Sequence, residues 1–304
     1  WGYVNEADPY VMDMQCRAAL DHGVNVFIYD WYWYDGRPFL ENCLNDGFLK
    51  CDASKDMRFY LMWANHDAVS LWDKRTSDTV NTVIWEGGVD LNRFKAAMRR
   101  VIDRYFHLEN YYTIDGKPVF MIYDIPALAR GLGGPERLRE AVEWLRGECV
   151  RAGLPGLHLQ FVMWSDRATN LSGVDGGKAI PAEEFSSLGF DSCTHYQFVH
   201  FTNIDRAYPD VLEDVKKEYA RLDGRFGFPY FPHVSLGWDN NPRFNSFRSG
   251  VLRDCTPENI EKALRAAKDY ADRHPLQPKL ITINSWNEWT ESSYLEPDDL
   301  HGYG

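Results

Sequence analysis

Residues 24–33 read VNVFIYDWYW, a run of β-branched and aromatic residues that contains one carboxylate, Asp30. A short apolar run of this kind is typical of a buried parallel strand, because both faces of such a strand are covered. Six further runs share this character, and they lie at residues 58–67, 117–126, 157–166, 190–199, 230–240 and 279–289. The sequence therefore predicts seven buried strands along the chain.

Helical patterns precede the first run and separate most of the others. Apolar residues recur every three or four positions, behind a capping residue or a first-turn proline, within residues 9–20, 90–105, 135–153, 209–223 and 256–271. The alternation predicts an α/β fold, a (β/α)8 TIM barrel that forms a single domain over residues 1–304. Seven strands leave one unaccounted for, and we expect the first strand upstream of Trp1. A doubly wound sheet would fit the same alternation but usually brings a glycine-rich nucleotide turn, which this sequence lacks.

Composition narrows the choice of partner. The net charge is -12, which disfavours nucleic acid because that partner draws its affinity from clustered Lys and Arg. No apolar stretch approaches the roughly 20 residues of a membrane span. The six cysteines are scattered without a CxxC pair, so we expect no metal cage, and we expect no cofactor. The chain opens on WGYVNE, with neither a start methionine nor a signal peptide, so a periplasmic, extracellular or cytoplasmic location stays open. The sequence also leaves the oligomeric state open.

In a βα barrel the active site lies at the carboxyl ends of the strands. There the sequence places aromatic rings beside carboxylates, amides and imidazoles, the chemistry of a carbohydrate pocket, in which rings stack on apolar sugar faces. The bland alternative is that these rings cap the core. The expected substrate contacts are Asp30, Trp31, Trp33, Trp63, Asn65, His66, Asp67, Tyr123, Trp164, His195, Tyr196, His233, Trp238, Asp239, Asn284, Trp286 and Asn287. With Trp289, seven of the 11 tryptophans are expected at one barrel mouth.

The last predicted strand carries two carboxylates three residues apart, Glu288 and Glu291. In an extended strand they would face opposite ways. If the chain turns after Trp286, both can point into one pocket, and two carboxylates beside one glycosidic bond are the usual equipment for glycoside hydrolysis. We therefore expect Glu288 and Glu291 to be the catalytic pair.

The segment 284–298, NSWNEWTESSYLEPD, resembles the signature of the WbsX-type, glycoside hydrolase family 99-like proteins, which are related to endo-α-1,2-mannosidases. Other pieces of the resemblance follow in order along almost the whole chain, at residues 27–33, 63–65, 115–120 and 237–240. The resemblance implies that the last barrel helix lies beyond Gly304. Two departures stand out: Thr290 occupies the position of a histidine in the mannosidases, and His66-Asp67 replace a Glu-Asn pair common in WbsX proteins.

The resemblance also implies a mechanism that retains the anomeric configuration. The residue matching Glu288 would deprotonate the substrate 2-hydroxyl, whose oxygen then forms a 1,2-anhydro sugar, while the residue matching Glu291 protonates the leaving oxygen. Attack by O2 requires a 1,2-trans arrangement, so the expected substrates are α-mannosides or α-rhamnosides within an oligo- or polysaccharide. A double displacement through a covalent glycosyl-enzyme stays open.

Three other functions remain in competition. The first is a glycosyltransferase of polysaccharide biosynthesis, although no Asp-x-Asp pair is present and GVDGGK at 173–178 misses the P-loop spacing. The second is a metal-dependent hydrolase that uses His66, Asp67, His195 and His233. The third is a glycan-binding barrel without catalysis.

Overall fold

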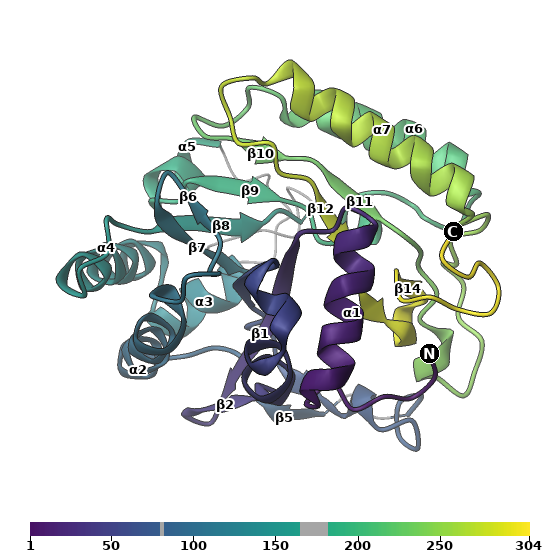
Figure 1. Cartoon of the computed structure of the whole chain (residues 1–304). Helices are drawn as coiled ribbons and strands as arrows, with labels where there is room; N and C mark the ends of the chain where they lie inside the picture. The colour runs from purple at the N-terminus through teal and green to yellow at the C-terminus, as the bar shows by residue number, and fades with distance from the viewer. Residues whose placement is uncertain (80–81, 165–181) are drawn as a thin grey trace.

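The computed structural model describes residues 1–79, 82–164 and 182–304 (Figure 1). Every predicted run contains a strand. The long ones are β1 (Val26–Tyr34), β3 (Arg58–Trp63), β7 (Lys117–Ile122) and β8 (His158–Val162), and the short ones are β9 (Ser192–Thr194), β10 (Tyr230–Phe231), β11 (His233–Ser235) and β12 (Thr282–Asn284). The prediction of seven parallel strand segments in an α/β fold is thus confirmed.

These strands pair in parallel and in chain order. The ladder runs from β1 through β3, β7, β8 and β9 to β10, and β11 continues it to β12. Pro232 divides β10 from β11, since proline has no N–H for a ladder, but its carbonyl still accepts from Thr282 N at 3.0 Å. Among the described residues no ladder joins β12 back to β1. The parallel sheet is therefore shown, while barrel closure and an upstream first strand stay predictions.

The helices surround this sheet. They are α1 (Pro9–Asp21), α2 (Leu91–Val101), α3 (Ile125–Leu132), α4 (Pro135–Arg151), α5 (Ala182–Ser187), α6 (Tyr208–Leu222) and α7 (Pro257–Arg273). Asp90 caps α2 as predicted, accepting from Arg93 N at 2.9 Å. Helix α3 was not expected. It begins inside the run at 117–126, where Asp124 caps it by accepting a hydrogen bond from Ala127 N at 2.8 Å. Helices α6 and α7 lie side by side, and α1 crosses in front of the sheet next to β14 (Figure 1).

Short strands and helical turns lie in the segments between the main strands and helices. The additional strands are β2 (Arg37–Phe39), β4 (Ala68–Val69), β5 (Val83–Trp85), β6 (Thr113–Ile114), β13 (Asn287–Glu288) and β14 (Ser293–Tyr294). The helical turns are Cys43–Gly47, Phe48–Lys50, Asp52–Lys55, Ser70–Trp72, Ile102–Phe106, Phe198–His200, Asn241–Arg243 and Trp289–Glu291. The turn Asn241–Arg243 carries Arg243, and the turn Trp289–Glu291, which follows Glu288 of β13, carries Glu291.

Alternation along β1 separates the core from the site. Trp31 lies 6.0 Å, ring to ring, from Trp63, which in turn lies 6.1 Å from Phe94 of α2, so this face meets the helices. Asp30 points to the opposite face, where the hydroxyl of Tyr196 donates to it from beyond β9. Successive side chains of a strand face opposite sides. On β1, Trp31 therefore faces the helices, and the carboxylate of Asp30 lies on the other face of the sheet, with Tyr196.

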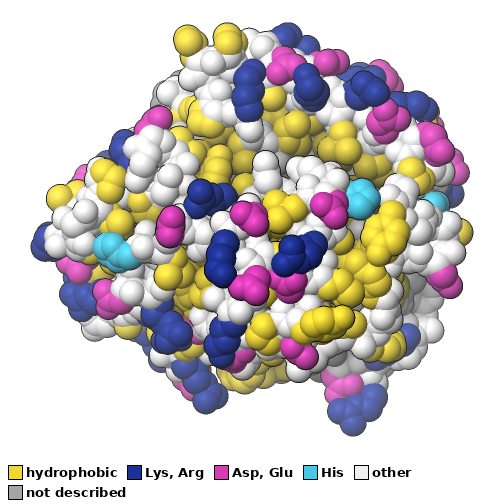
Figure 2. Space-filling view, in the orientation of Figure 1, with side chains coloured by type: hydrophobic (Ala, Val, Ile, Leu, Met, Phe, Trp, Pro, Cys, Tyr) yellow, Lys and Arg dark blue, Asp and Glu magenta, His cyan; other side chains and the backbone are white. Residues whose placement is uncertain are grey.

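The surface carries both signs of charge. On the face in Figure 2, Lys and Arg side chains are interspersed with Asp and Glu over α6, α7 and the centre of the view. None of the helices in the described ranges has the length and apolar content needed to cross a bilayer.

Candidate active site

Two carboxylates meet at the hairpin after β12. In the β13–β14 pairing Glu288 lies opposite Ser293, and the turn Trp289–Glu291 closes the hairpin. Ser285 bonds to both strands of the hairpin: its Oγ accepts from Glu288 N at 3.2 Å and donates to Ser293 O at 2.7 Å. The turn directs Glu288 and Glu291 to the same side, as expected from the sequence if the chain turned there.

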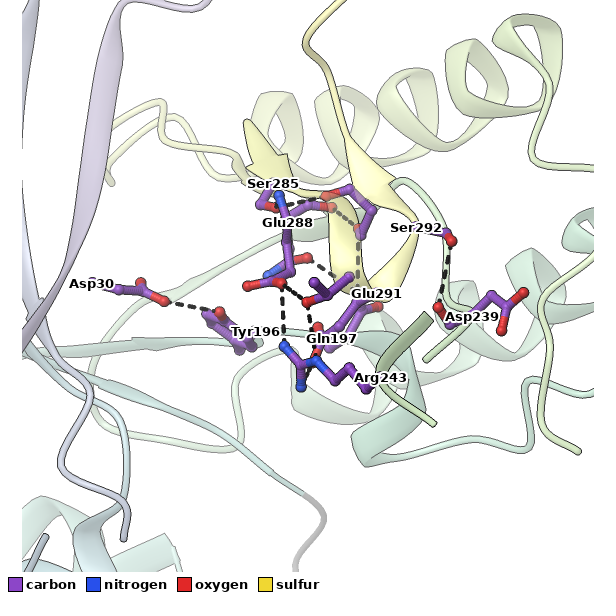
Figure 3. A network of polar contacts seen from close by, with 12 residues as sticks. Asp30, Tyr196, Gln197, Asp239, Arg243, Ser285, Glu288, Glu291 and Ser292 are labelled. Atoms are coloured by element: carbon purple, nitrogen blue, oxygen red, sulfur yellow. Dashed lines mark hydrogen bonds and ion pairs between the residues drawn. The ribbon is translucent and has the colours of Figure 1, made fainter. Parts of the chain in front are cut away.

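Arg243 joins the two carboxylates. Its Nη2 lies 3.1 Å from Glu288 Oε1, and its Nη1 lies 3.0 Å from Glu291 Oε1 (Figure 3). The Arg243 Nε also donates to Thr290 Oγ1 at 3.0 Å, and that hydroxyl donates to Glu288 Oε1 at 2.6 Å. One planar guanidinium therefore sets the spacing and orientation of both acids.

Sequence reasoning missed Arg243, which sits in a helical turn five residues after Trp238. Asp239 holds that turn: its Oδ1 accepts from Asn241 N at 2.9 Å, and its backbone N donates to Glu291 O at 2.8 Å. The one available signal was a cation within the polar cluster that follows the strand at 230–240. Asp239 thus positions the site through the backbone.

The two carboxylates differ in environment. The Glu291 side chain is 12% exposed and that of Glu288 is 32% exposed. Burial raises the pKa of Glu291 to about 7, against the opposing charge of Arg243 and with a smaller contribution from the negative charge of Glu288. Near neutral pH Glu291 is therefore partly protonated, as a general acid must be.

A third carboxylate, Asp30, lies close enough to Glu288 and Glu291 to interact with their charges. Asp30 Oδ2 accepts a hydrogen bond of 3.0 Å from the hydroxyl of Tyr196 (Figure 3). Burial raises the pKa of Asp30 to about 7, the Tyr196 hydrogen bond opposes the rise, and the charge of Glu288 adds to it. Asp30 and Tyr196 are thus expected site residues that the structure does bring next to the carboxylate pair.

Aromatic rings line the same region. The ring of Tyr123 lies 5.1 Å from Trp164, 5.0 Å from Tyr196 and 5.7 Å from His66. His200, which was not anticipated, stacks on Trp164 at 4.2 Å. All of these except His200 were expected sugar contacts. Tyr32, also not anticipated, lies 6.0 Å from His66.

Other expected contacts are placed elsewhere. Trp31, Trp33 and Trp63 are buried between the sheet and its helices, because they occupy the core-facing positions of β1 and β3. Trp286 lies against Phe27 at 5.2 Å, and Trp289 stacks on Tyr294 at 3.7 Å. The expected gathering of seven tryptophans therefore needs correction: Trp164 lines the aromatic cluster, and Trp238 is half-buried just after β11.

The amides and the remaining acid have structural partners. Asn65 is fully buried, and its side chain donates to Asp124 O at 2.7 Å and accepts from Asp124 N at 2.8 Å. Asn284 Oδ1 accepts from Gln197 at 3.1 Å, and Asn287 donates to Glu6 at 2.8 Å. The last case is Asp67, which accepts from Gly87 N at 2.8 Å.

The four groups of the metal alternative are not brought together. His195 Nδ1 lies 2.6 Å from Met163 O, and its Nε2 faces Glu218 of α6 at 3.4 Å. His233 contacts Thr282 and Ser235 inside the sheet. Within the part of the chain that the structure describes, no group of three or more His, Cys, Asp or Glu residues could hold a metal ion. The last two residues of the predicted run at 157–166, and the segment 173–178, lie outside the described residues.

Solved structures with a similar fold include an endo-alpha-mannosidase and a glycoside hydrolase-like protein. The endo-alpha-mannosidase of glycoside hydrolase family 99 from Bacteroides thetaiotaomicron is 15% identical, with a TM-score of 0.63 over 99% of this chain and 75% of that one. A chain described as a glycoside hydrolase-like protein is also 15% identical, with a TM-score of 0.63 over 97% of this chain and 81% of that one. At this identity the likeness establishes the fold.

Sequence comparison gives the family. Two proteins from strains of Xanthomonas campestris pv. campestris, both named uncharacterized protein WxcX, are 25% identical over 304 residues. The match covers 99% of this chain and 41% of theirs, so the chain spans about two fifths of the length of these curated relatives. The model of the family described as Glycosyltransferase WbsX matches residues 1–304. The chain therefore belongs to the WbsX family, on a fold that it shares with family 99 endo-α-mannosidases.

Proposed function

We propose that the chain is a retaining glycoside hydrolase that cleaves 1,2-trans α-linked glycans of the α-mannoside or α-rhamnoside type. The observation that carries the proposal is the carboxylate pair on one guanidinium: Arg243 contacts Glu288 at 3.1 Å and Glu291 at 3.0 Å. Glycosidic bond cleavage needs two acids beside the bond, and here two acids follow the carboxyl end of a parallel strand, near a cluster of aromatic rings. The fold shared with family 99 endo-α-mannosidases supports the same assignment.

The two acids take different roles because their environments differ. Glu291, with a pKa near 7, protonates the leaving oxygen. Glu288 is the base toward the substrate 2-hydroxyl. Its described contacts, from Arg243 and Thr290, fall on Oε1, which leaves Oε2 to take the proton. O2 then closes on the anomeric carbon as the leaving group departs, and water opens the resulting 1,2-anhydro sugar with the two roles reversed.

A double displacement is the alternative chemistry for the same pair, with Glu288 as nucleophile. Trapping with a 2-fluoro sugar separates the two mechanisms, because the fluorine removes the 2-hydroxyl on which the anhydro route depends. A stable covalent adduct on Glu288 would contradict the anhydro route. Turnover that requires the 2-hydroxyl, with no adduct, would support it.

The hydrolase proposal is tested on a panel of α-mannan, rhamnose-containing polysaccharides and N-glycans, with products sized. We expect the wild-type chain to release fragments from a member of the panel. Glu288→Gln and Glu291→Gln should each lose about 10² to 10⁴ in rate. The matched control is Glu261→Gln on α7, an exposed carboxylate paired with Arg265, which should keep the wild-type rate.

A glycosyltransferase is the second candidate, and the family description favours it. Titration with nucleotide sugars distinguishes the two functions. Tight binding of a nucleotide sugar, together with transfer to a glycan acceptor, would replace the hydrolase proposal. Release of free sugar or oligosaccharide from the panel in the absence of nucleotide would exclude the need for that donor.

A further inference from the structure

Two tryptophans stand close to Glu288 in the sequence, Trp286 and Trp289, and the indole N–H of each donates to a buried polar side chain. Trp286 Nε1 donates to Gln15 Oε1 at 3.1 Å, and Trp289 Nε1 donates to Glu296 Oε2 at 2.6 Å. Gln15 Nε2 in turn donates to Glu296 Oε1 at 2.7 Å, across 281 residues of sequence. Both indoles are therefore fastened to one pair of side chains, Gln15 and Glu296, which we call the anchor pair.

The anchor pair is built into the protein interior. Gln15 is 1% exposed and lies on α1, and Glu296 is 9% exposed just after β14. Hydrogen bonds to a buried carboxylate are stronger than those in water, and losing one partner leaves a buried polar group unsatisfied. The backbone adds to this attachment, because Leu295 N and Glu296 N both donate to Trp286 O at 3.0 Å.

Glu288 thus lies on a hairpin that two sets of contacts hold. Arg243 and Thr290 contact its carboxylate. The anchor pair holds the residue that follows Glu288 and the residue two positions before it. Glu6 also contacts this region: it accepts from Gln15 at 3.4 Å and from Asn287 at 2.8 Å, and so ties the N-terminal segment to the same hairpin.

We propose that Gln15 and Glu296 are positioning residues for the reaction, which fix the β13–β14 hairpin and with it the carboxylates of Glu288 and Glu291. The inference rests on the proposed hydrolase function. A displacement of about 1 Å at a reacting group costs on the order of 10²-fold in rate, so a loosened hairpin lowers kcat more than it weakens glycan binding. Trp286 and Trp289 then belong to this attachment and not to the sugar-binding surface.

The experiment has a readout that does not depend on activity. Hydrogen exchange is followed by mass spectrometry in the wild-type chain, in Gln15→Ala, in Trp289→Phe and in the control Tyr10→Ala, an α1 residue that is 80% exposed. We expect faster exchange in residues 285–296 for the first two variants and no change for Tyr10→Ala. Trp289→Phe keeps an aromatic ring to stack on Tyr294 and removes the indole N–H together with the five-membered ring that carries it. Unchanged protection of 285–296 in Gln15→Ala would overturn the inference.

The catalytic readout is kcat and KM on α-mannan oligosaccharides. We expect Gln15→Ala to lose about 10 to 100-fold in kcat, with KM within about threefold of wild type. Glu296→Gln, which keeps one acceptor oxygen, should retain more activity than Glu296→Ala. The Gln15→Ala and Glu296→Ala losses should not multiply in the double variant, because both remove the same attachment.

The outcomes separate the two claims. Faster exchange with an unchanged kcat would reduce the pair to a structural contact and overturn the positioning role. A wild-type chain that cleaves no glycan of the panel would overturn the proposed hydrolase function instead, and the exchange experiment would still decide whether the pair holds the hairpin.

Discussion

Arg243 and Glu291 form an ion pair, Nη1 to Oε1 at 3.0 Å, although the Glu291 side chain is only 12% exposed. Burial raises the pKa of Glu291 to about 7, and the Arg243 charge is the main opposing influence. The general acid must be protonated to act, so activity should fall as the pH rises through about 7.

Removing Arg243 should move the pH at which activity falls, the alkaline limb of the curve of activity against pH. In Arg243→Gln the carboxyl group keeps its burial and loses its cation, so the pKa of Glu291 rises further and the limb shifts to higher pH. The maximal rate should also fall, because Glu288 and Glu291 lose their common partner. The measurement is kcat/KM against pH for both proteins, and a limb at the same pH in the two would contradict the role given to Arg243.

Asp30 predicts a pH-dependent stability. Its pKa is about 7 in the folded state against 3.8 as the ordinary value, so the folded chain holds the proton more tightly between those values. The stability it contributes is full below about pH 4 and is lost as the pH rises to 7. Asp30→Asn should therefore raise the free energy of unfolding at pH 8 by up to about 4 kcal/mol and change it little at pH 4. Urea denaturation at the two pH values tests this, and a variant less stable than wild type at pH 8 would count against it.

A substitution at Asn65 distinguishes a residue that binds sugar from a residue that holds the backbone of Asp124. Its amide makes both hydrogen bonds to the backbone of Asp124, at 2.7 and 2.8 Å, and it is fully buried. Asn65→Ala should lower the free energy of unfolding by roughly 2 kcal/mol, since it leaves the backbone N–H of Asp124 without a partner. The carbonyl of Asp124 loses one of its two hydrogen bonds and keeps the one from Leu128 N. KM of the folded fraction should stay near the wild-type value. A large rise in KM without loss of stability would return Asn65 to the substrate surface.

Two tryptophans should behave in opposite ways. Trp63 is fully buried among Trp31 and Phe94, so Trp63→Phe should destabilise the fold and leave KM unchanged. Trp164 is half-buried, beside Tyr123 and His200, so Trp164→Ala should raise KM by about 2 to 10-fold if its ring stacks on a sugar. Thermal unfolding and KM measured on both variants decide, and equal effects on KM would contradict the separation.

The strands were predictable because their signal is local. Each run of apolar and aromatic residues encloses a strand, and Asp90 and the first-turn prolines marked helix starts where the structure has them. Facing direction was harder to predict. The sequence around Asp30 and Trp31 is apolar and aromatic on both sides, so it did not separate the core-facing tryptophans from the face that carries Asp30.

The site was predictable only in part. Glu288 and Glu291 stand three apart in one motif, and a single turn brings them together. Arg243 reaches them from a loop 45 residues upstream of Glu288, a contact that no local pattern encodes. The hydrogen bond between Gln15 and Glu296 joins residues that are 281 apart in the sequence, and both appeared as ordinary polar residues of a helix and a loop.

The central claim is that Glu291 protonates the leaving group of a glycan, and leaving-group dependence tests it most directly. The measurement compares Glu291→Gln with the wild-type chain on an unactivated α-linked glycan and on the matching glycosyl fluoride, whose departure needs no proton. We predict a loss of about 10² to 10⁴-fold on the glycan and a much smaller loss on the fluoride. Equal losses on both substrates, or no loss on the glycan, would contradict the account.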